Sequence, residues 1–211
     1  MTESTQVRTQ ASCWAQQYKD LVGTVETPCG IGSTMEATGP IRDGLEQIIS
    51  SFGLKSLTDI PCGDMNWMRH VNLTGVDYLG CDVVQDIINV NKKAFPGMHF
   101  KVMNAVEEVP RESDLILCRD LLFHLSNEWA LKVIQNFVAS GSRYLLTTTF
   151  DKLEKNEPLK MQGFINWRKI NVQIEPFCLP APVAIIDEGN SHACQGRLVG
   201  LFDLFEYKEK S

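Results

Sequence analysis

The chain has 211 residues, of which 44% are hydrophobic and 22% are charged, an ordinary balance for a globular protein that argues against general disorder. Twenty basic residues against twenty-six acidic ones give a formal net charge of -6. Duplex nucleic acid and anionic membrane surfaces attract positive patches, so we expect neither as a partner. No apolar run reaches the roughly 18 residues that span a bilayer. Residues 1–10 lack the apolar core of a signal peptide.

The seven cysteines are an odd number with wide spacing, and no two of them form a CxxC pair. We therefore expect no zinc site of the usual spacing and assign no metal ligands. Cys81 and Cys118 stand within apolar runs, where cysteine acts as a small buried hydrophobe. Reduced thiols of this kind favour a cytoplasmic protein over a secreted one.

The first predicted element follows a loop rich in Gly, Ser, Thr and Pro at residues 27–40. After Pro40, apolar residues recur at helical spacing until Gly53 ends the run, which predicts a helix. Short apolar segments with the length of buried strands follow, at residues 56–60, 78–81, 99–103, 114–118 and 143–148. Helix-length segments separate most of them, at residues 65–71, 84–94 and 127–139, and Ser126 is placed to cap the last one.

After residue 150 the pattern changes to a charged loop and an irregular segment that contains prolines. Two further strands, at residues 183–186 and 198–206, close the chain. Strands that alternate with helices predict an α/β fold with a mostly parallel sheet and helices on both faces, and the last two strands predict an antiparallel edge. We expect a single domain over residues 1–211, with residues 1–12 frayed.

Residues suited to ligand binding follow the first two strands. The first strand ends in Asp59 and leads into a turn with Gly63, where the backbone can approach a ligand closely and a helix start would offer free N–H groups. Asp82 ends the second strand, nineteen positions after Gly63. An acidic residue at this distance is placed to accept hydrogen bonds from ribose hydroxyls. Either aspartate alone suits a helix cap, but together they favour a nucleoside-bearing cofactor.

On these residues the chain resembles the class I S-adenosylmethionine-dependent methyltransferases, which have a Rossmann-like sheet. Residues 59–63 resemble the motif that holds the methionine part of the cofactor, and Asp82 resembles the acidic residue that contacts ribose. Residues 117–120 and 123–125 resemble the motif beside the transferred methyl group. The resemblance implies that residues 32–150 bind the cofactor, and that residues 151–211 form the acceptor side and close the sheet. S-adenosylhomocysteine would be the product.

The candidate cofactor-binding residues combine this resemblance with a small-residue loop before the first helix. They are Ser33, Asp59, Cys62, Gly63, Trp67, Asp82, Val83, Asn104, Ala105, Cys118 and Arg119. The chain departs from the family at two places. Pro61 and Cys62 leave Gly63 as the single glycine of the turn, and Asn104 replaces a common Asp, although an amide oxygen still accepts a hydrogen bond from adenine.

A more specific resemblance rests on a set of short motifs. The chain carries Asp-x-Pro-Cys-Gly-Asp with a Trp three residues later, then Arg-Asp, His-Leu, a Thr-rich stretch and Pro-Phe-x-x-Pro-x-Pro, at residues 59–64, 67, 119–120, 124–125, 147–149 and 176–182. This set is similar to a methyltransferase domain joined to glycosyltransferases in large algal viruses, which O-methylates a rhamnose of the capsid glycan. It implies a sugar or glycan acceptor, a place in glycan biosynthesis in the host cytoplasm, and a larger glycosyltransferase-containing protein.

Asp120 and His124 are the candidate catalytic residues. Methyl transfer to a hydroxyl requires an aligned acceptor and a group that takes its proton. Residues four positions apart share a face of a helical turn, so histidine would act as the base while the carboxylate orients it or accepts the proton itself. In the alternative, His124 packs under the next helix while Asp120 caps it or pairs with Arg119.

The candidate acceptor-binding residues are Thr149, Trp167, Arg168 and Asn171. The last three form an aromatic and polar group suited to a sugar, although a surface-facing turn would have the same composition. Among the cofactor-binding candidates, Trp67 has a similar alternative, because its side chain would equally fill the core. A divalent cation stays open, with Asp120 and Asp151 as the available oxygen ligands.

Two other functions also stay open: a non-catalytic binding module of methyltransferase type, and a methyltransferase for another small molecule. A nicotinamide dehydrogenase is disfavoured because Pro61 and Asp64 interrupt the Gly-x-Gly-x-x-Gly pattern. A nucleic-acid base methyltransferase is disfavoured because residues 118–120 lack its Asn/Asp-Pro-Pro-aromatic motif and the chain is acidic.

Overall fold

The computed structural model describes residues 3–160, 166–189 and 195–210. Within them, a seven-stranded sheet has the order β3-β2-β1-β4-β5-β7-β6. Its strands are β1 (Ser56–Asp59), β2 (Asp77–Asp82), β3 (His99–Val102), β4 (Leu115–Cys118), β5 (Tyr144–Thr149), β6 (Ala184–Asp187) and β7 (Leu198–Asp203). The first five strands pair in parallel, and β7 runs antiparallel to both β5 and β6. The predicted fold class is confirmed, including the antiparallel C-terminal strands.

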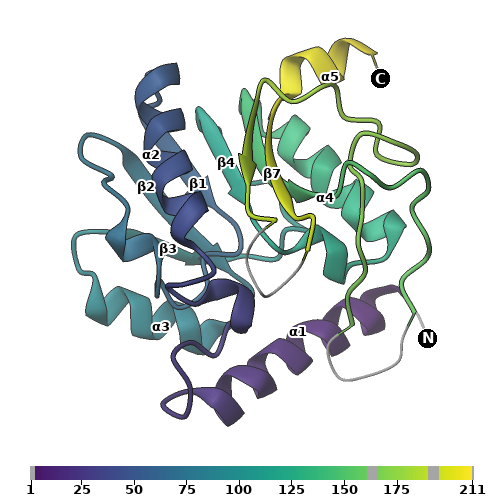
Figure 1. The fold of residues 1–211 in the computed structure, drawn as a ribbon. Helices are drawn as coiled ribbons and strands as arrows, with labels where there is room; N and C mark the ends of the chain where they lie inside the picture. The colour runs from purple at the N-terminus through teal and green to yellow at the C-terminus, as the bar shows by residue number, and fades with distance from the viewer. Residues whose placement is uncertain (1–2, 161–165, 190–194, 211) are drawn as a thin grey trace.

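Helices surround this sheet, as Figure 1 shows. They are α1 (Glu3–Leu21), α2 (Gly39–Phe52), α3 (Gln85–Ala94), α4 (Asn127–Ala139) and α5 (Leu204–Lys210), with 3-10 turns η1 (Ile31–Ser33), η2 (Met68–His70) and η3 (Leu122–His124). The two helix ends that the sequence predicts, Ser126 at the start of α4 and Gly53 at the end of α2, are confirmed. The Ser126 hydroxyl accepts a hydrogen bond from the Trp129 amide at 3.2 Å, and Gly53 ends α2 with a left-handed φ of 62°.

Two apolar clusters pack on the two faces of the sheet. One lies under α4 and α5 and includes Phe137 and Phe177, and the other lies under α2 and includes Leu45 and Leu146. Every residue of β4 and β5 is buried, which explains why these strands read as continuous apolar runs. Because β1 pairs in parallel with both β2 and β4, the carboxyl ends of these three strands lie at one edge of the sheet.

The predicted helix at residues 65–71 is wrong. This segment holds only the short turn η2, because Met65 has a left-handed φ of 62° that interrupts a right-handed helix. The side chains of Met65, Trp67 and Met68 are all buried, so their apolar spacing reflects packing into the core rather than one face of a helix.

The predicted strand at residues 198–206 is too long at its C-terminal end. β7 stops at Asp203, whose carboxylate accepts hydrogen bonds from the amides of Phe205 at 2.9 Å and Glu206 at 3.4 Å. An aspartate in this position is an N-cap, and α5 begins directly after it.

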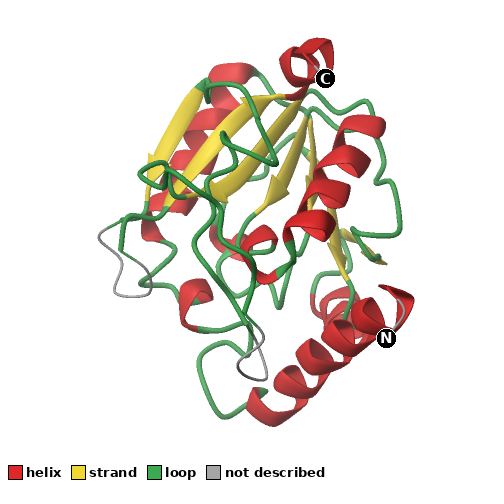
Figure 2. Cartoon of the chain, turned by 90° about the vertical axis from the view of Figure 1, so that its right-hand side faces the viewer, coloured by secondary structure: helices red, strands yellow, loops and turns green. Residues whose placement is uncertain are grey.

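Helix α1 was not predicted, and it begins inside residues 1–12, which we expected to fray. Trp14 and Tyr18, one helical turn apart, are its large aromatic side chains, and α1 contacts α3. Figures 1 and 2 show that α1 lies across the end of the sheet. A mostly polar helix of this kind is stabilised by tertiary packing, which local sequence does not reveal.

Candidate functional site

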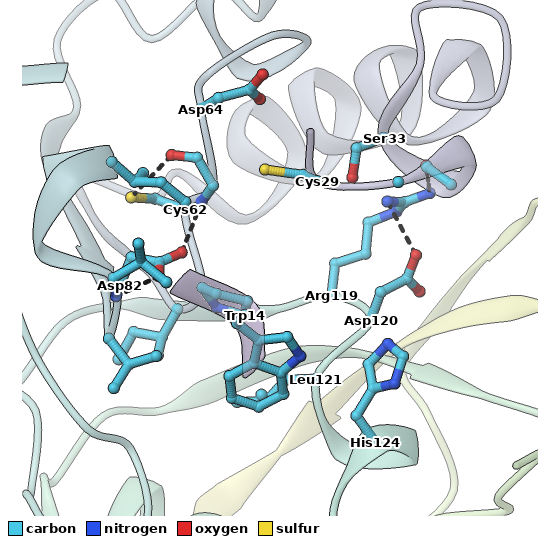
Figure 3. Close-up of a pocket in the computed structure, with 18 of the residues that line it drawn as sticks. Trp14, Cys29, Ser33, Cys62, Asp64, Asp82, Arg119, Asp120, Leu121 and His124 are labelled. Atoms are coloured by element: carbon cyan, nitrogen blue, oxygen red, sulfur yellow. Dashed lines mark hydrogen bonds and ion pairs between the residues drawn. The ribbon is translucent and has the colours of Figure 1, made fainter. Parts of the chain in front are cut away.

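A cavity of about 390 Å³ lies at the carboxyl ends of the parallel strands (Figure 3). One wall follows β1 and β2, a second follows β3, a third follows β4, and α1 with the segment 28–33 forms the opposite side. This is the position at which open α/β sheets bind ligands, and the volume lies within the range of small-molecule sites.

The turn after β1 presents its backbone to the cavity. Gly63 has a left-handed φ of 55°, and a Cβ atom placed on it would come within 2.9 Å of the Cys29 sulfur. The Cys62 amide donates to the carbonyl of Cys81 at 2.8 Å, and the Asn91 side chain donates to the carbonyl of Gly63 at 2.8 Å. These bonds fix the turn, so its glycine is required for conformation and for space.

Asp82 stands beside this turn with its carboxylate in the cavity wall (Figure 3). Its Oδ2 accepts from the Gly63 amide at 3.2 Å, and its Oδ1 accepts from the Val84 amide at 2.9 Å. Burial raises the pKa of Asp82 to about 6, although these backbone hydrogen bonds oppose the shift. The carboxylate is thus mostly ionised at neutral pH and can accept further hydrogen bonds from hydroxyl donors.

The next part of the wall is mostly apolar. Val83, Met103 and Ala105 line it together with Asn104, whose side-chain oxygen accepts from the Val106 amide at 3.1 Å. Apolar side chains beside one amide suit a flat heterocycle with polar edges.

Arg119 and Asp120 form the polar end of the cavity, after β4. Asp120 Oδ1 accepts from the Thr148 hydroxyl at 2.9 Å, and Oδ2 lies 2.9 Å from Arg197 Nη1 and 3.2 Å from Arg119 Nη1. The Arg119 guanidinium also packs over the ring of Trp67, 5.7 Å from its centroid. Asp120 is therefore held by a hydroxyl and two cations.

His124 lies below Asp120 at the same end of the cavity (Figure 3). Its Nδ1 is 2.7 Å from the carbonyl oxygen of Asn166, and because a carbonyl only accepts, Nδ1 carries the proton and Nε2 holds the lone pair of the neutral ring. Burial lowers the pKa of His124 below its usual value, with the Asn166 carbonyl and the Asp120 charge opposing the shift. The imidazole is therefore mostly neutral at neutral pH.

Most of the predicted site residues line this one cavity. They are Ser33, Cys62, Gly63, Trp67, Asp82, Val83, Asn104, Ala105, Arg119, Asp120, His124 and Trp167. Their roles stay predictions, but the structure brings them together from six separate segments of the chain.

Five other predicted residues lie outside the cavity lining. Asp59 is buried and accepts from the Tyr78 hydroxyl at 2.9 Å, and Cys118 is fully buried in β4. The remaining three serve the backbone of nearby loops. Thr149 accepts from the Val172 amide, Asn171 donates to the carbonyls of Asp151 and Leu153, and Arg168 donates to the carbonyls of Glu157 and Leu125.

Sequence reasoning missed two groups at the site. Trp14, Gln17 and Tyr18 of α1 line the cavity, although their helix carried only a weak apolar pattern. Arg197, the residue directly before β7, also lines it and is 2% exposed. A charged residue directly before a buried strand was the one available signal for Arg197.

Among the residues that the structure describes, there is no group of three or more His, Cys, Asp or Glu side chains that could hold a metal ion. Within the same residues, no helix is long and apolar enough to cross a membrane.

The chain matches no known family model and no curated protein, but it is similar to solved structures of S-adenosylmethionine-dependent methyltransferases. One is a 1,6-didemethyltoxoflavin N1-methyltransferase from Burkholderia thailandensis, with bound S-adenosylhomocysteine (12% identity, TM-score 0.69, 96% of this chain and 90% of that one). Another is an N-methyltransferase from Bradyrhizobium japonicum, also with S-adenosylhomocysteine (12% identity, TM-score 0.63, 89% and 97%). A third comes from Clostridium acetobutylicum (12% identity, TM-score 0.60, 90% and 97%). The protein therefore has the class I methyltransferase fold.

Proposed function

We propose that this protein is an S-adenosylmethionine-dependent O-methyltransferase that methylates a sugar or glycan hydroxyl, with rhamnose as the first candidate. The main support for this proposal is that one cavity joins the Gly63 turn and the buried Asp82 carboxylate, at one end, to His124 at the other end. In a class I methyltransferase fold, this arrangement supports a nucleoside cofactor and a proton acceptor within one site.

The cavity residues fit the chemistry of this cofactor. Asp82 would accept hydrogen bonds from ribose hydroxyls, and the apolar wall at Val83 and Ala105 would cover adenine, with Asn104 at its edge. Arg119 would face the methionine carboxylate. When bound, S-adenosylmethionine supplies a methyl group on a positively charged sulfur.

His124 is the proposed proton acceptor. Its neutral imidazole carries a lone pair on Nε2, and its lowered pKa keeps that form populated at neutral pH. Asp120 has both oxygens engaged by Thr148, Arg119 and Arg197, contacts that suit a side chain that orients its neighbours. We infer that Asp120 positions the polar end of the site and that His124 removes the proton from the acceptor hydroxyl.

A sugar acceptor is supported by aromatic side chains near His124. Trp167 is 52% exposed, lines the cavity and packs edge-on against Phe123, with ring centroids 6.1 Å apart. Phe123 contacts His124 in the same way, with centroids 4.6 Å apart. Exposed aromatic rings stack on apolar sugar faces, and the net charge of -6 agrees with a neutral acceptor. The motif resemblance supports a place in cytoplasmic glycan biosynthesis, beside a glycosyltransferase.

Calorimetric titration with S-adenosylhomocysteine, followed by a product-release assay, tests this function. The acceptor panel would contain rhamnosides, other neutral glycosides and small heterocyclic amines, because two of the similar structures are N-methyltransferases. We expect binding and turnover with a glycoside. Binding of S-adenosylhomocysteine without turnover of any acceptor would favour a non-catalytic module. Turnover with an amine alone would favour another small-molecule methyltransferase. Absence of S-adenosylhomocysteine binding would overturn the proposal. Gly63→Ala, which places a Cβ atom against Cys29, is the matched variant that should not bind.

A further inference from the structure

Four charged side chains from separate parts of the sequence form a closed ring of ion pairs at the polar end of the cavity. Arg119 Nη2 lies 3.0 Å from Glu188 Oε1, and Arg197 Nε lies 3.1 Å from Glu188 Oε2. Both guanidinium groups also contact Asp120 Oδ2. Each arginine thus bridges the same two carboxylates.

Glu188 differs from the other members of the ring in its position. Arg119, Asp120 and Arg197 line the cavity, whereas Glu188 lies outside the lining and is 0% exposed. It follows β6, and its amide donates to the carbonyl of Arg197 at 3.0 Å, which holds the start of β7 beside it. A buried carboxylate contacted by two guanidinium groups acts as their counter-charge.

The charges of this ring sum to zero, because two arginines face two carboxylates. Removal of the Glu188 charge would leave a net charge of +1 at the cavity wall without deleting any side chain that lines the cavity. The other acidic residues of the cavity, Asp64 and Asp82, stand on the opposite wall (Figure 3). They do not contact the ring, so they would not replace the lost charge at close range.

We propose that Glu188 balances the positive charges of Arg119 and Arg197. From its position outside the cavity, it thus allows the cavity wall that these two arginines form to accept a cationic ligand. It thereby sets the preference of the site for S-adenosylmethionine over S-adenosylhomocysteine, whose sulfur is uncharged. This inference rests on the proposed function. It assigns a role in ligand discrimination to a residue that would not touch either ligand.

The test compares the dissociation constants of the two ligands by calorimetry in Glu188→Gln, which keeps the shape of the side chain and removes its charge. We expect the ratio of the S-adenosylmethionine constant to the S-adenosylhomocysteine constant to rise about tenfold, the effect of one charge over roughly 10 Å at an effective dielectric constant near 20. Arg197→Met should shift the ratio in the opposite direction. The double variant restores neutrality and should return the ratio toward the wild-type value. Glu154→Gln, at an exposed position outside the cavity, is the control with the same change in net charge.

The outcomes separate this inference from the proposed function. If the wild-type protein binds neither ligand, the proposed function fails and the inference fails with it. If the wild type binds both ligands and Glu188→Gln weakens both by the same factor, Glu188 has only a structural role and the inference alone is overturned. Glu188→Asp retains the charge and should keep the wild-type ratio, so a change in that variant would also count against charge balance.

Discussion

Replacement of Asp82 by asparagine separates ligand binding from folding. Asparagine has the same shape as aspartate but only one acceptor oxygen. The backbone amide of either Gly63 or Val84 would therefore face the NH2 group of the asparagine, which would lower the free energy of unfolding by about 1–3 kcal/mol. The substitution also removes a buried charge whose pKa is raised from 3.8 to about 6, which relieves about 3 kcal/mol at neutral pH. These effects oppose each other, so we expect the free energy of unfolding to change by no more than about 2 kcal/mol.

Ligand affinity should respond more strongly. A hydrogen bond to a charged group contributes about 1 kcal/mol more than one to a neutral group. If the carboxylate accepts from two ribose hydroxyls, as we propose, its loss should weaken binding by about 2 kcal/mol, or roughly thirtyfold. Calorimetry with S-adenosylhomocysteine measures this, and urea unfolding measures stability. Asp64→Asn is the matched control, because Asp64 lines the same cavity and accepts from the Asn66 amide of its own loop. Wild-type affinity in Asp82→Asn, or an equal loss in Asp64→Asn, would refute the reasoning.

Three further predictions concern the proton acceptor, a buried acid and the turn over the cavity. His124→Gln should reduce kcat by about 10²- to 10⁴-fold with little effect on S-adenosylhomocysteine affinity. It should also abolish the rise in kcat that we expect of the wild type as pH increases through a pKa below 6.5. Burial raises the pKa of Asp59 to about 8, so the native protein retains a proton that the unfolded chain releases above about pH 4. Urea unfolding should therefore show stability falling from about pH 4 to about pH 8, by up to about 1.4 kcal/mol per pH unit, and a flatter profile in Asp59→Asn. Gly32→Ala would place a Cβ atom 3.0 Å from Asp120 Oδ2 and should weaken ligand binding, whereas Gly39→Ala, whose Cβ atom finds its nearest neighbour at 3.9 Å, should bind as the wild type does.

The elements that the sequence predicted well have local causes. Strands β4 and β5 are buried at every residue and so appear as apolar runs, and Ser126 and Gly53 mark helix ends by their own conformational preferences. Gly63 and Asp82 could be placed together because the carboxyl ends of neighbouring parallel strands meet at one edge.

Only the tertiary structure decided the partners of the charged side chains. Arg119 and Glu188 are separated by 69 positions, and their contact exists because β7 and β6 join the sheet beyond β5, the neighbour of β4. Only the structure shows that Arg168, a predicted acceptor residue, donates to the carbonyls of nearby loops, and that Trp14 of an unpredicted helix lines the cavity. Residue type and spacing fix which groups a chain carries and where strands and helices end. The path of the backbone in three dimensions fixes which of those groups meet.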